Sequence, residues 1–457
     1  MMAQHGRHTD RFCPPAPFPG PETKTNLALA LRTFRSQIEG LPREVFEEDA
    51  WKPPLPGMPL FIMSPDAIQR VLLTEAEHYP HGALFERIMR PVWGRGLLLS
   101  QGEAWQTQRR ASAQAFRAAD VAKLAPFFVQ ATRTALARWA DLPDGRIDAL
   151  EEMKRITFDV ILDTMLSGAE VFDRETIRQT AKDFFTDINR MRLSYFFRQD
   201  AYHERRPQTT SRHRGPLVAH IARLVANRRT STPRGDLVDF LMAARDNETG
   251  LGLSDEQLAD NLLGFILAGH ETTAVALTWT LYLVAAHPPT RDRLTAEAAT
   301  VLGAGDVTPE TLPQLVFARQ VISEAMRLYP PAFLLTRVSM RDTTLAGHQV
   351  KAGQRVNIPI YAIHRRASVW NDPHAFDPDR FGPRREPPSR YAYMPFGGGP
   401  RICIGAAFAM AEAVTVLTTL LRSKQFEPPP REIVWPQTGM ALHPRNGMPM
   451  AVKQLVS

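Results

Sequence analysis

Residues 262–286 form an almost continuously apolar segment, long enough to cross a membrane or the centre of a large protein. His270 and Glu271 stand near its middle, together with several threonines. An ionisable pair at the centre of a bilayer is costly, whereas a long helix through the core of a soluble protein has the same apolar composition without that cost. The segment therefore predicts a buried central helix rather than a transmembrane span.

The rest of the chain can supply a large core around such a helix. Its 457 residues are 44% hydrophobic and 23% charged, as in ordinary globular proteins. Helical patterns dominate the first three quarters, and β-branched residues separated by glycine turns follow between 333 and 363. We expect a mainly α fold with a small β portion, in which residues 25–457 form a single domain after a proline-rich N-terminal arm at 1–24.

Charge and cysteine content indicate the setting. The net charge of +7, with a sequence pI near 9.6, comes from scattered Lys and Arg residues, which favours a weakly positive face for an acidic partner over nucleic-acid binding. Cys13 and Cys403 lie far apart in the sequence, so we expect no disulfide framework and a cytoplasmic location. The first 25 residues have no apolar stretch typical of a secretory signal or a membrane anchor.

Residues 188–214 differ from their surroundings because they mix aromatic side chains with many arginines. Such a mixture suits a nucleic-acid or membrane surface. It suits equally a surface helix–loop–helix with a solvated basic side, which is the more ordinary interpretation. In either case the segment is a candidate for a role other than core packing.

The strongest chemical signal lies in residues 396–405, where three consecutive glycines, a proline and an arginine precede Cys403. Glycine permits tight backbone paths and the close approach of a flat ligand. Cys403 directly precedes the last predicted helix, 404–421, whose unpaired N–H groups and dipole favour negative charge on sulfur. A thiolate in that position is a good ligand for ferric iron, and Arg401 could pair with an anionic edge of the same ligand.

This segment resembles the haem-binding loop of the cytochrome P450 family, Phe-x-x-Gly-x-Arg-x-Cys-x-Gly, through Phe396, Gly399, Arg401, Cys403 and Gly405. The resemblance implies the triangular, predominantly α fold of that family, with haem b as cofactor. It also implies that Cys403 is the axial thiolate ligand of the iron, whose electron donation favours cleavage of the O–O bond.

A second match lies in the apolar segment, where Ala268, Gly269, Glu271 and Thr272 fit the family's oxygen-binding pattern, (Ala/Gly)-Gly-x-(Glu/Asp)-Thr. The two small residues are expected to leave room for dioxygen above the iron. By this resemblance Thr272 relays protons to the distal oxygen, with Glu271 as its acidic partner. The structural alternative is a threonine bonded only to its own helix. His270 and Glu271 also begin a His-Glu-x-x-His zinc pattern, but the second histidine is absent, which excludes a metalloprotease.

A third match concerns the core of the fold. Glu324 and Arg327 have the family's Glu-x-x-Arg spacing, which places both side chains on one helical face. Arg380 supplies the arginine that completes the family's buried Glu-Arg-Arg network. For these three residues the resemblance implies a structural role beneath the haem and no direct part in the chemistry.

Smaller matches concern the seating of the haem. Trp105 and Arg109 resemble the family's helical pair that holds a haem propionate, and Arg337 occupies the place of another propionate-binding arginine. Each of these side chains could equally be an ordinary surface or core residue.

The resemblance implies a monooxygenase that inserts one oxygen atom from O2 into an apolar small molecule of fatty-acid, terpenoid or aromatic type. Two electrons are expected from a separate donor, such as an acidic ferredoxin with its reductase, and the enzyme is expected to be a monomer. Arg109, Arg110 and Arg117 are the candidate docking charges. An apolar pocket wall is expected from Phe85, Ile88, Tyr195, Phe196, Phe333, Leu334 and Leu335.

Two alternatives share this fold. A peroxide-dependent peroxygenase or isomerase needs no electron donor, but such relatives usually lack the threonine and the acid that this chain keeps at Thr272 and Glu271. A non-catalytic haem protein would not need those relay residues.

Overall fold

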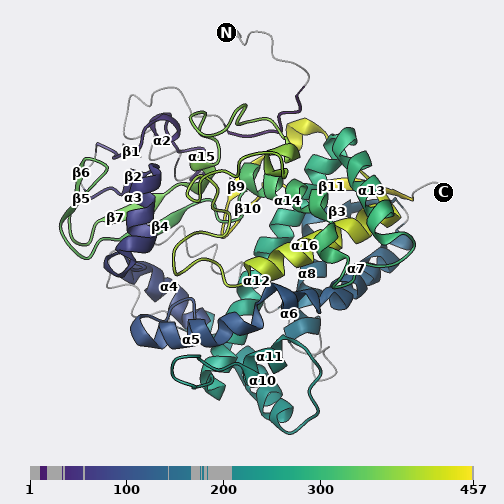
Figure 1. Cartoon of the computed structure of the whole chain (residues 1–457), viewed down its shortest axis with the longest axis horizontal. Helices are drawn as coiled ribbons and strands as arrows, with labels where there is room; N and C mark the ends of the chain where they lie inside the picture. The colour runs from purple at the N-terminus through teal and green to yellow at the C-terminus, as the bar shows by residue number, and fades with distance from the viewer. Residues whose placement is uncertain are drawn as a thin grey trace.

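A central helix organises the molecule. In the computed structural model, which describes residues 11–17, 33, 36–54, 57–142, 144–165, 175, 178, 179, 183 and 208–454, helix α12 (Asp255–Ala286) runs through the middle of the fold (Figure 1). It begins with a capping box, in which Ser254 and Gln257 each accept the other's backbone N–H. The predicted central helix is confirmed, although it starts before Leu262 because the first turns are capped by polar residues outside the apolar segment.

The other helices surround α12 and each other. Helix α8 (Ala149–Met165) and the C-terminal helix α16 (Ala406–Ser423) both pack against α12, and α7 (Ala125–Ala140) packs against both α8 and α16. Helices α12 and α16 are long and apolar enough to cross a membrane by length and composition, and 72% and 67% of their most apolar stretches are buried inside the protein. Their apolar surfaces therefore face the protein's own core.

The remaining helices of the described chain cover this core or carry parts of the site. Five short helices of the described residues lie near the four-stranded sheet that is described in the next paragraph. They are α2 (Glu44–Glu47), α3 (Pro65–Gln69), η1 (Arg70–Thr74), η2 (Ala76–His78) and α15 (Ile360–Ile363). The longer ones are α4 (Ala83–Trp93), α5 (Gly102–Ala115), α10 (Gln208–Arg229), α13 (Pro288–Leu302) and α14 (Val316–Leu328). The others are α6 (Ala118–Ala122), α11 (Leu237–Ala243), η4 (Leu312–Gln314), η5 (Pro378–Phe381) and η6 (Arg431–Ile433).

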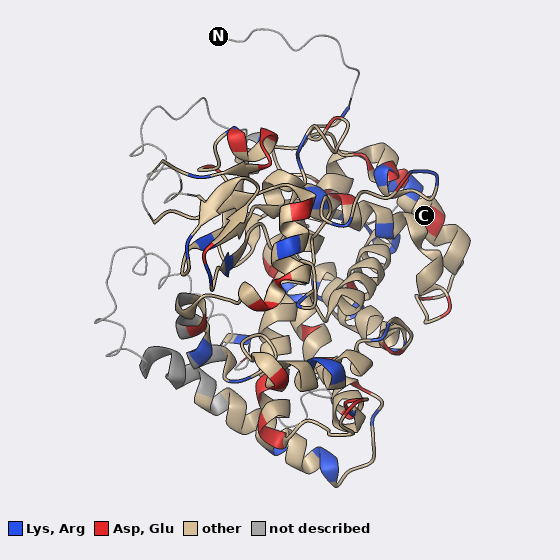
Figure 2. Cartoon of the chain, turned by 60° about the vertical axis from the view of Figure 1, so that its left-hand side comes forward, with Lys and Arg blue, Asp and Glu red and all other residues tan. Residues whose placement is uncertain are grey.

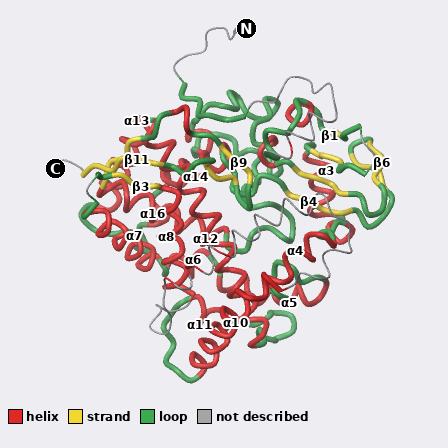
Figure 3. The backbone as a smooth tube through the Cα atoms, turned by 180° about the vertical axis from the view of Figure 1, so that it is seen from behind, coloured by secondary structure: helices red, strands yellow, loops and turns green. Residues whose placement is uncertain are grey.

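The strands form small sheets. The largest has the order β1 (Ala50–Trp51), β2 (Leu60–Ile62), β7 (Arg355–Ile358) and β4 (Leu335–Val338), with β2 and β7 parallel and the other pairs antiparallel. A second sheet joins β3 (Arg146–Asp148), β11 (Pro449–Gln454) and β8 (Lys424–Glu427). Two hairpins pair β5 (Thr343–Leu345) with β6 (His348–Val350) and β9 (Pro436–Thr438) with β10 (Leu442–Pro444). Figure 3 shows the sheet with β3 and β11 at one side of the molecule, the one with β1 and β4 at the other, and β9 between them.

The predicted fold class is confirmed, and the outline in Figure 1 narrows from the sheet-bearing end toward α10 and α11. The change from helices to strands after Leu328 occurs where Pro330 and Pro331 follow the end of α14, because proline cannot continue a helix. Of the basic-aromatic segment 188–214, residues 188–207 lie outside the described residues and 208–214 open helix α10.

Part of the N-terminal arm lies against the core. The backbone carbonyl of Phe12 accepts a hydrogen bond of 3.0 Å from the Phe376 N–H, and the two rings meet edge to face. The Tyr329 hydroxyl donates to the carbonyl of Pro15. Residues 11–17 are thus attached to the region around η5, whereas the rest of the predicted arm lies outside the described residues.

Along the ribbon in Figure 2, acidic and basic residues are interspersed. This agrees with the scattered positions of Lys and Arg in the sequence. A nucleic acid or another polyanion is attracted by a large cluster of positive charges. Among the described residues coloured in Figure 2, blue and red positions are mixed and form no large blue cluster.

Candidate active site around Cys403

The loop before α16 places Cys403 deep in the protein with its side chain still accessible. The Cys403 N–H donates a 2.9 Å hydrogen bond to the carbonyl of Phe396, which closes the loop on itself. Gly397 and Gly399 have positive φ angles of 76° and 68°, a region that side-chain-bearing residues rarely adopt. A Cβ atom at Gly399 would lie 1.7 Å from the Leu72 carbonyl oxygen, so this glycine also allows the loop to approach the backbone of η1.

The surroundings of the sulfur act in opposing directions on its charge. Burial raises the pKa of the Cys403 thiol, while the Gly405 N–H and the positive charge of Arg109 lower it. Burial is the largest of these effects, so the expectation that the helix start alone favours a thiolate is revised. A bound metal ion deprotonates a coordinating thiol, and the N–H of Gly405 and the charge of Arg109 would then stabilise the thiolate.

One face of the central helix is open inside the core. Ala268 and Thr272, one helical turn apart, are exposed, although most of α12 around them is buried. The Thr272 hydroxyl donates a 2.8 Å hydrogen bond to the Ala268 carbonyl. Accessible side chains in the middle of a core helix indicate that this face borders an internal cavity. Glu271, the next residue toward the N-terminus from Thr272, is half-buried.

Gly269 and His270, which lie between Ala268 and Glu271 in the sequence, face helix α8. A Cβ atom at Gly269 would come within 3.1 Å of the Ile161 side chain, so helix packing explains the glycine. His270 is buried, its ring meets Phe158 edge to face, and its carbonyl accepts from the Thr157 hydroxyl at 2.9 Å. Burial lowers the pKa of His270 to about 3, so the imidazole is neutral and serves packing against α8.

Positive side chains converge near the Cys403 loop. The Arg401 guanidinium lies 4.5 Å from the centre of the Trp105 ring and donates to the Ser100 carbonyl at 2.8 Å. Arg337, on β4, is buried, and its pKa is lowered to about 10 by burial and by the charge of Arg401. Burial lowers the pKa of Arg109, and the charge of Cys403 opposes that shift.

Sequence reasoning missed His81 as a member of this cluster. Its Nδ1 lies 3.4 Å from Nη1 of Arg337, and its ring stacks on Phe85 with 4.9 Å between centroids. Burial, Arg337 and Arg401 lower the pKa of His81 to about 3. A lone histidine before α4 carries no spacing signal, so only the folded arrangement brings it to the arginines.

These features fit a flat, dianionic cofactor bound through iron. Besides burial, the charge of Arg401 lowers the pKa of Arg337, and that of Arg109 lowers the pKa of Arg401, so an anion bound among these partly buried arginines would stabilise them. The accessible sulfur of Cys403 supplies a single soft ligand, and the open face of α12 supplies space. Haem fits both features: its two carboxylates would bind the arginines, and its iron would bind the Cys403 sulfur.

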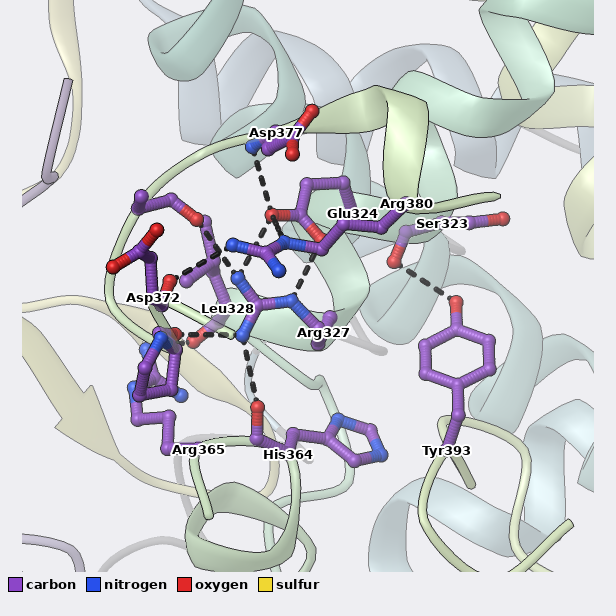
Figure 4. A network of polar contacts seen from close by, with 12 residues as sticks. Ser323, Glu324, Arg327, Leu328, His364, Arg365, Asp372, Asp377, Arg380 and Tyr393 are labelled. Atoms are coloured by element: carbon purple, nitrogen blue, oxygen red, sulfur yellow. Dashed lines mark hydrogen bonds and ion pairs between the residues drawn. The ribbon is translucent and has the colours of Figure 1, made fainter. Parts of the chain in front are cut away.

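The glutamate and arginines of the third sequence match form a buried network (Figure 4). Arg327 binds Glu324 through Nε–Oε2 at 2.6 Å and Nη2–Oε1 at 2.8 Å, and both side chains are 0% exposed. Arg380 Nε lies 3.4 Å from Glu324 Oε1. Arg327 also donates to the carbonyls of His364, Pro373 and Ala375. The Glu-x-x-Arg motif therefore ties α14 to the long segment that leads to Cys403.

His364 extends this network to the cysteine loop. Its carbonyl accepts from Arg327 at 2.9 Å, and its Nε2 accepts from the Met394 N–H at 2.8 Å. Burial and the charges of Arg327 and Arg365 lower its pKa to about 3, which keeps the ring neutral and able to accept. Tyr393 stacks beside it and donates to the Ser323 carbonyl, as Figure 4 shows.

The candidate docking arginines are not equivalent in the structure. Arg110 binds Asp246 through two hydrogen bonds of 2.7 and 2.9 Å, and it also contacts Glu248. Its charge is therefore largely compensated, which removes it from the set of docking charges. Arg109 is half-buried near Cys403, whereas Arg117 is exposed.

Comparison with known proteins shows the family and the fold of this chain. The sequence profile of the family described as "Cytochrome P450" matches residues 54–449. Cyclooctatin synthase from Streptomyces melanosporofaciens is 32% identical over 83% of each chain. Cyclooctat-9-en-7-ol 5-monooxygenase from the same organism is 30% identical over 80% of each. The heme domain of cytochrome P450DA superposes with a TM-score of 0.78 at 23% identity, over 89% of this chain and 90% of that one.

Proposed function

The chain belongs to the cytochrome P450 family, and from that premise we propose a specific activity for it. It is a haem-binding monooxygenase with the fold of that family. In our proposal, it inserts one oxygen atom from O2 into an apolar small molecule and receives two electrons from a separate protein.

Each residue of the cluster has a role in this proposal. Cys403 would hold the haem iron through its sulfur, and Arg337, Arg401 and Arg109, together with Trp105, would hold the two propionates. When bound, the haem supplies the reductive activation of dioxygen, to which an axial thiolate contributes electron density. Phe396 accepts the Cys403 N–H and so keeps the loop in shape.

The distal side depends on Thr272. Its hydroxyl lies on the open face of α12, where it donates to the Ala268 carbonyl and can hold a proton at Oγ1, and Glu271, the preceding residue, is the acid assigned to the relay. The carrying observation is that the structure has both an accessible threonine on a core helix and an accessible cysteine in the half-buried loop before α16. A haem protein that only carries or senses a ligand has no use for a hydroxyl–carboxyl pair in this place.

The substrate class follows from the lining of the site and from the relatives. Phe85 and Leu335 lie beside the arginine cluster and the cysteine loop, respectively, and both are partly buried apolar side chains. One relative acts, by its name, on cyclooctat-9-en-7-ol, an unsaturated alcohol. We assign to this chain a substrate of that kind, largely hydrocarbon with few polar groups.

The axial ligand is tested on the purified holoenzyme. Reduced and exposed to carbon monoxide, it is expected to give the red-shifted absorption band of a thiolate complex, and C403S is expected to lose it. Iron ligated by a histidine, or a wild-type spectrum without that band, would overturn the assignment of Cys403.

The relay and the electron supply are tested by turnover. When a ferredoxin and its reductase supply the electrons, T272A should release about tenfold more hydrogen peroxide per molecule of product than the wild type does. The reason is that positioned proton transfer typically raises the rate of the catalysed step by about 10²–10⁴-fold. Product formed with hydrogen peroxide alone, at the same rate as with the donor pair, would instead establish a peroxygenase.

The electron donor is proposed to be an acidic ferredoxin that docks near α5. Arg117 is exposed at the end of this helix, close in sequence to Arg109, which lies near Cys403. Reversing the charge in R117E should lower the rate of donor-dependent reduction at low salt, and this difference should vanish at high salt. An unchanged rate at low salt would exclude this docking charge.

A further inference from the structure

Helix α8 contacts the central helix directly beside the residues assigned to the relay. Thr157 and Phe158 lie four and three positions before Ile161, so the three side chains share one face of α8, and all are buried. The Ile161 side chain lies 3.1 Å from where a Cβ atom of Gly269 would be. The Phe158 ring meets the His270 ring edge to face, with 5.5 Å between centroids. The face therefore contacts two consecutive residues of α12.

The hydroxyl of Thr157 reaches both helices. Its oxygen lies 2.9 Å from the Met153 carbonyl of α8, 3.3 Å from the Lys154 carbonyl, and 2.9 Å from the His270 carbonyl of α12. Helical threonines usually donate to the carbonyl four residues earlier. Thr164, which is on the same helix and equally buried, donates at 2.7 Å to a carbonyl of α8 itself. Thr157 differs because its proton is shared between its own helix and the central one.

The carbonyl that Thr157 reaches belongs to the same peptide group as the N–H of Glu271. A peptide group is planar, so a hydrogen bond to this carbonyl also orients the backbone at which Glu271 begins. A backbone carbonyl has two acceptor lone pairs and can accept from Thr157 while it remains part of the helix. Thr272 comes next in the sequence, and its hydroxyl is bonded to the Ala268 carbonyl on the open face.

We propose that Thr157 is a positioning residue for the proton relay, whose hydroxyl ties the peptide group between His270 and Glu271 to helix α8. This inference rests on the proposed function, because it concerns the relay assigned to Thr272 and Glu271. Thr157 is 0% exposed and acts through the backbone of α12, without touching the reacting atoms.

The physical consequence is control over the orientation of one turn of α12. Apolar contacts between two helices tolerate small shifts, whereas a hydrogen bond fixes direction. A relay hydroxyl displaced by about 1 Å can lose on the order of 10²-fold in rate. The proposal also accounts for Gly269 and His270, which the relay itself does not use and which both face α8.

The first measurement follows the helix itself and does not depend on turnover. Hydrogen–deuterium exchange of the holoenzyme is measured by mass spectrometry for peptides that cover residues 268–274. The T157V variant replaces the hydroxyl by a methyl group of similar size, and its amides in this stretch should exchange about fivefold faster than those of the wild type. This factor corresponds to about 1 kcal/mol, the usual net contribution of one hydrogen bond.

The second measurement follows the fate of electrons and needs no identified substrate. Holoenzyme variants receive electrons from NADPH through a ferredoxin reductase and a ferredoxin in air, and the ratio of water to hydrogen peroxide formed is determined. Oxygen leaves as peroxide in place of water when protons are delivered poorly. T157V should lower the ratio about fivefold, a fraction of the full effect of a positioned proton relay.

Matched variants separate positioning from general damage to the core. T164V removes an equally buried hydroxyl of α8 that bonds within its own helix, so both measurements should stay at the wild-type values. T157S keeps the hydroxyl and should keep at least about half of the wild-type ratio. T272A is measured in parallel as the variant that removes the relay hydroxyl itself.

Two results would overturn the proposal. They are a T157V variant that equals T164V in either measurement, and a ratio in T157S as low as in T157V. An unchanged ratio in T272A contradicts the relay and with it the proposed function. A fall of the ratio in T272A without a fall in T157V contradicts only the positioning role.

A second pair of variants carries the test if T157V does not bind haem. In G269A the new methyl group would press on Ile161 and move the same turn away from α8, so the ratio should fall. Shortening the facing side chain in the G269A/I161V double variant should restore it. A wild-type ratio in G269A, or a double variant no better than G269A, would show that α8 does not position the turn.

Discussion

Single residues in the cysteine loop and the buried network have functions that their neighbours cannot replace. Gly399 has both a positive φ angle and no room for a Cβ atom, whereas the adjacent Gly398 has neither restriction. Arg327 uses all three nitrogens of its guanidinium, and each meets a different acceptor or pair of acceptors. Such residues are recognisable in the sequence only because the motif around them is recognisable.

Replacing Gly399 by alanine should abolish haem incorporation. The φ of 68° alone costs about 1–3 kcal/mol for a residue with a side chain, and the new Cβ atom would collide with the Leu72 carbonyl. G398A is the control, because its Cβ atom would make contacts of 3.4 Å or more. Haem per chain, measured after purification, should be near wild type for G398A, and equal haem content in both variants would contradict this account.

Arginine 327 should not tolerate lysine, although the charge is kept. One ammonium group cannot reproduce the fork of hydrogen bonds to Glu324 and three carbonyls, so R327K should lose on the order of 3 kcal/mol of the free energy of unfolding. R293K is the control, because Arg293 forms an exposed ion pair with Asp379. Its free energy of unfolding should change by less than about 1 kcal/mol. Urea unfolding of both holoenzymes measures the difference, and similar losses would argue against the network.

At the scale of elements, the central helix holds the loop between α4 and α5. Asp260 accepts the Arg95 N–H at 2.7 Å, and Asn261 accepts the Leu97 N–H at 2.6 Å. The Asn261 amide also donates to Gln108 of α5 at 3.0 Å. Because the Ser100 carbonyl in this loop accepts from Arg401, the first half of α12 is connected to the arginine cluster.

Removing the amide of Asn261 should loosen that loop. N261L leaves the Leu97 N–H and the Gln108 side chain without their partner in a buried place, which costs about 2–4 kcal/mol when both are counted. S254A, which removes the cap of the same helix, should cost about 1 kcal/mol. Thermal unfolding compares the two, and limited proteolysis should cut N261L, but not S254A, between residues 94 and 101.

Several elements were predictable from local pattern and others were not. The start of α3 is of the predictable kind: Ser64 precedes Pro65 at the first helical position, and the Ser64 side chain accepts the Ala67 N–H as a cap. The clamp between α12 and the loop after α4 had no sequence signal, because Asp260 and Asn261 contact residues more than 150 positions away. Long-range hydrogen bonds of this kind depend on the packing of elements and not on spacing.

On the scale of the whole molecule, stability should depend on buried neutral histidines. Burial lowers the pKa of His270 and His364 from 6.5 to about 3, and that of His374 to about 4. In the unfolded chain these imidazoles become protonated near pH 6.5, whereas in the folded chain they become protonated only near pH 3 to 4. Stability is therefore complete above about pH 6.5 and falls as the pH decreases.

The expected acid sensitivity can be assigned to particular side chains. At about pH 4.5, His270 and His364 should each lower the free energy of unfolding by roughly 2–3 kcal/mol, from 1.36 kcal/mol per pKa unit. His374 is half-buried, so solvent reduces its contribution. H364Q, whose amide oxygen can still accept from Met394, should flatten the profile of melting temperature between about pH 7.5 and 4.5. H348Q, in the β5–β6 hairpin, serves as the control. Parallel profiles for wild type and H364Q would refute the assignment.

The sequence by itself determined the helical character of the chain, the central apolar helix and the family, because these depend on periodicity and on short motifs in which the residues are near neighbours. Tertiary structure alone decided that His81 joins the arginine cluster, that Gly269 and His270 face α8, and that Arg110 is compensated by Asp246. In each of these cases the partner lies on another element, and its distance and burial arise only when the helices pack.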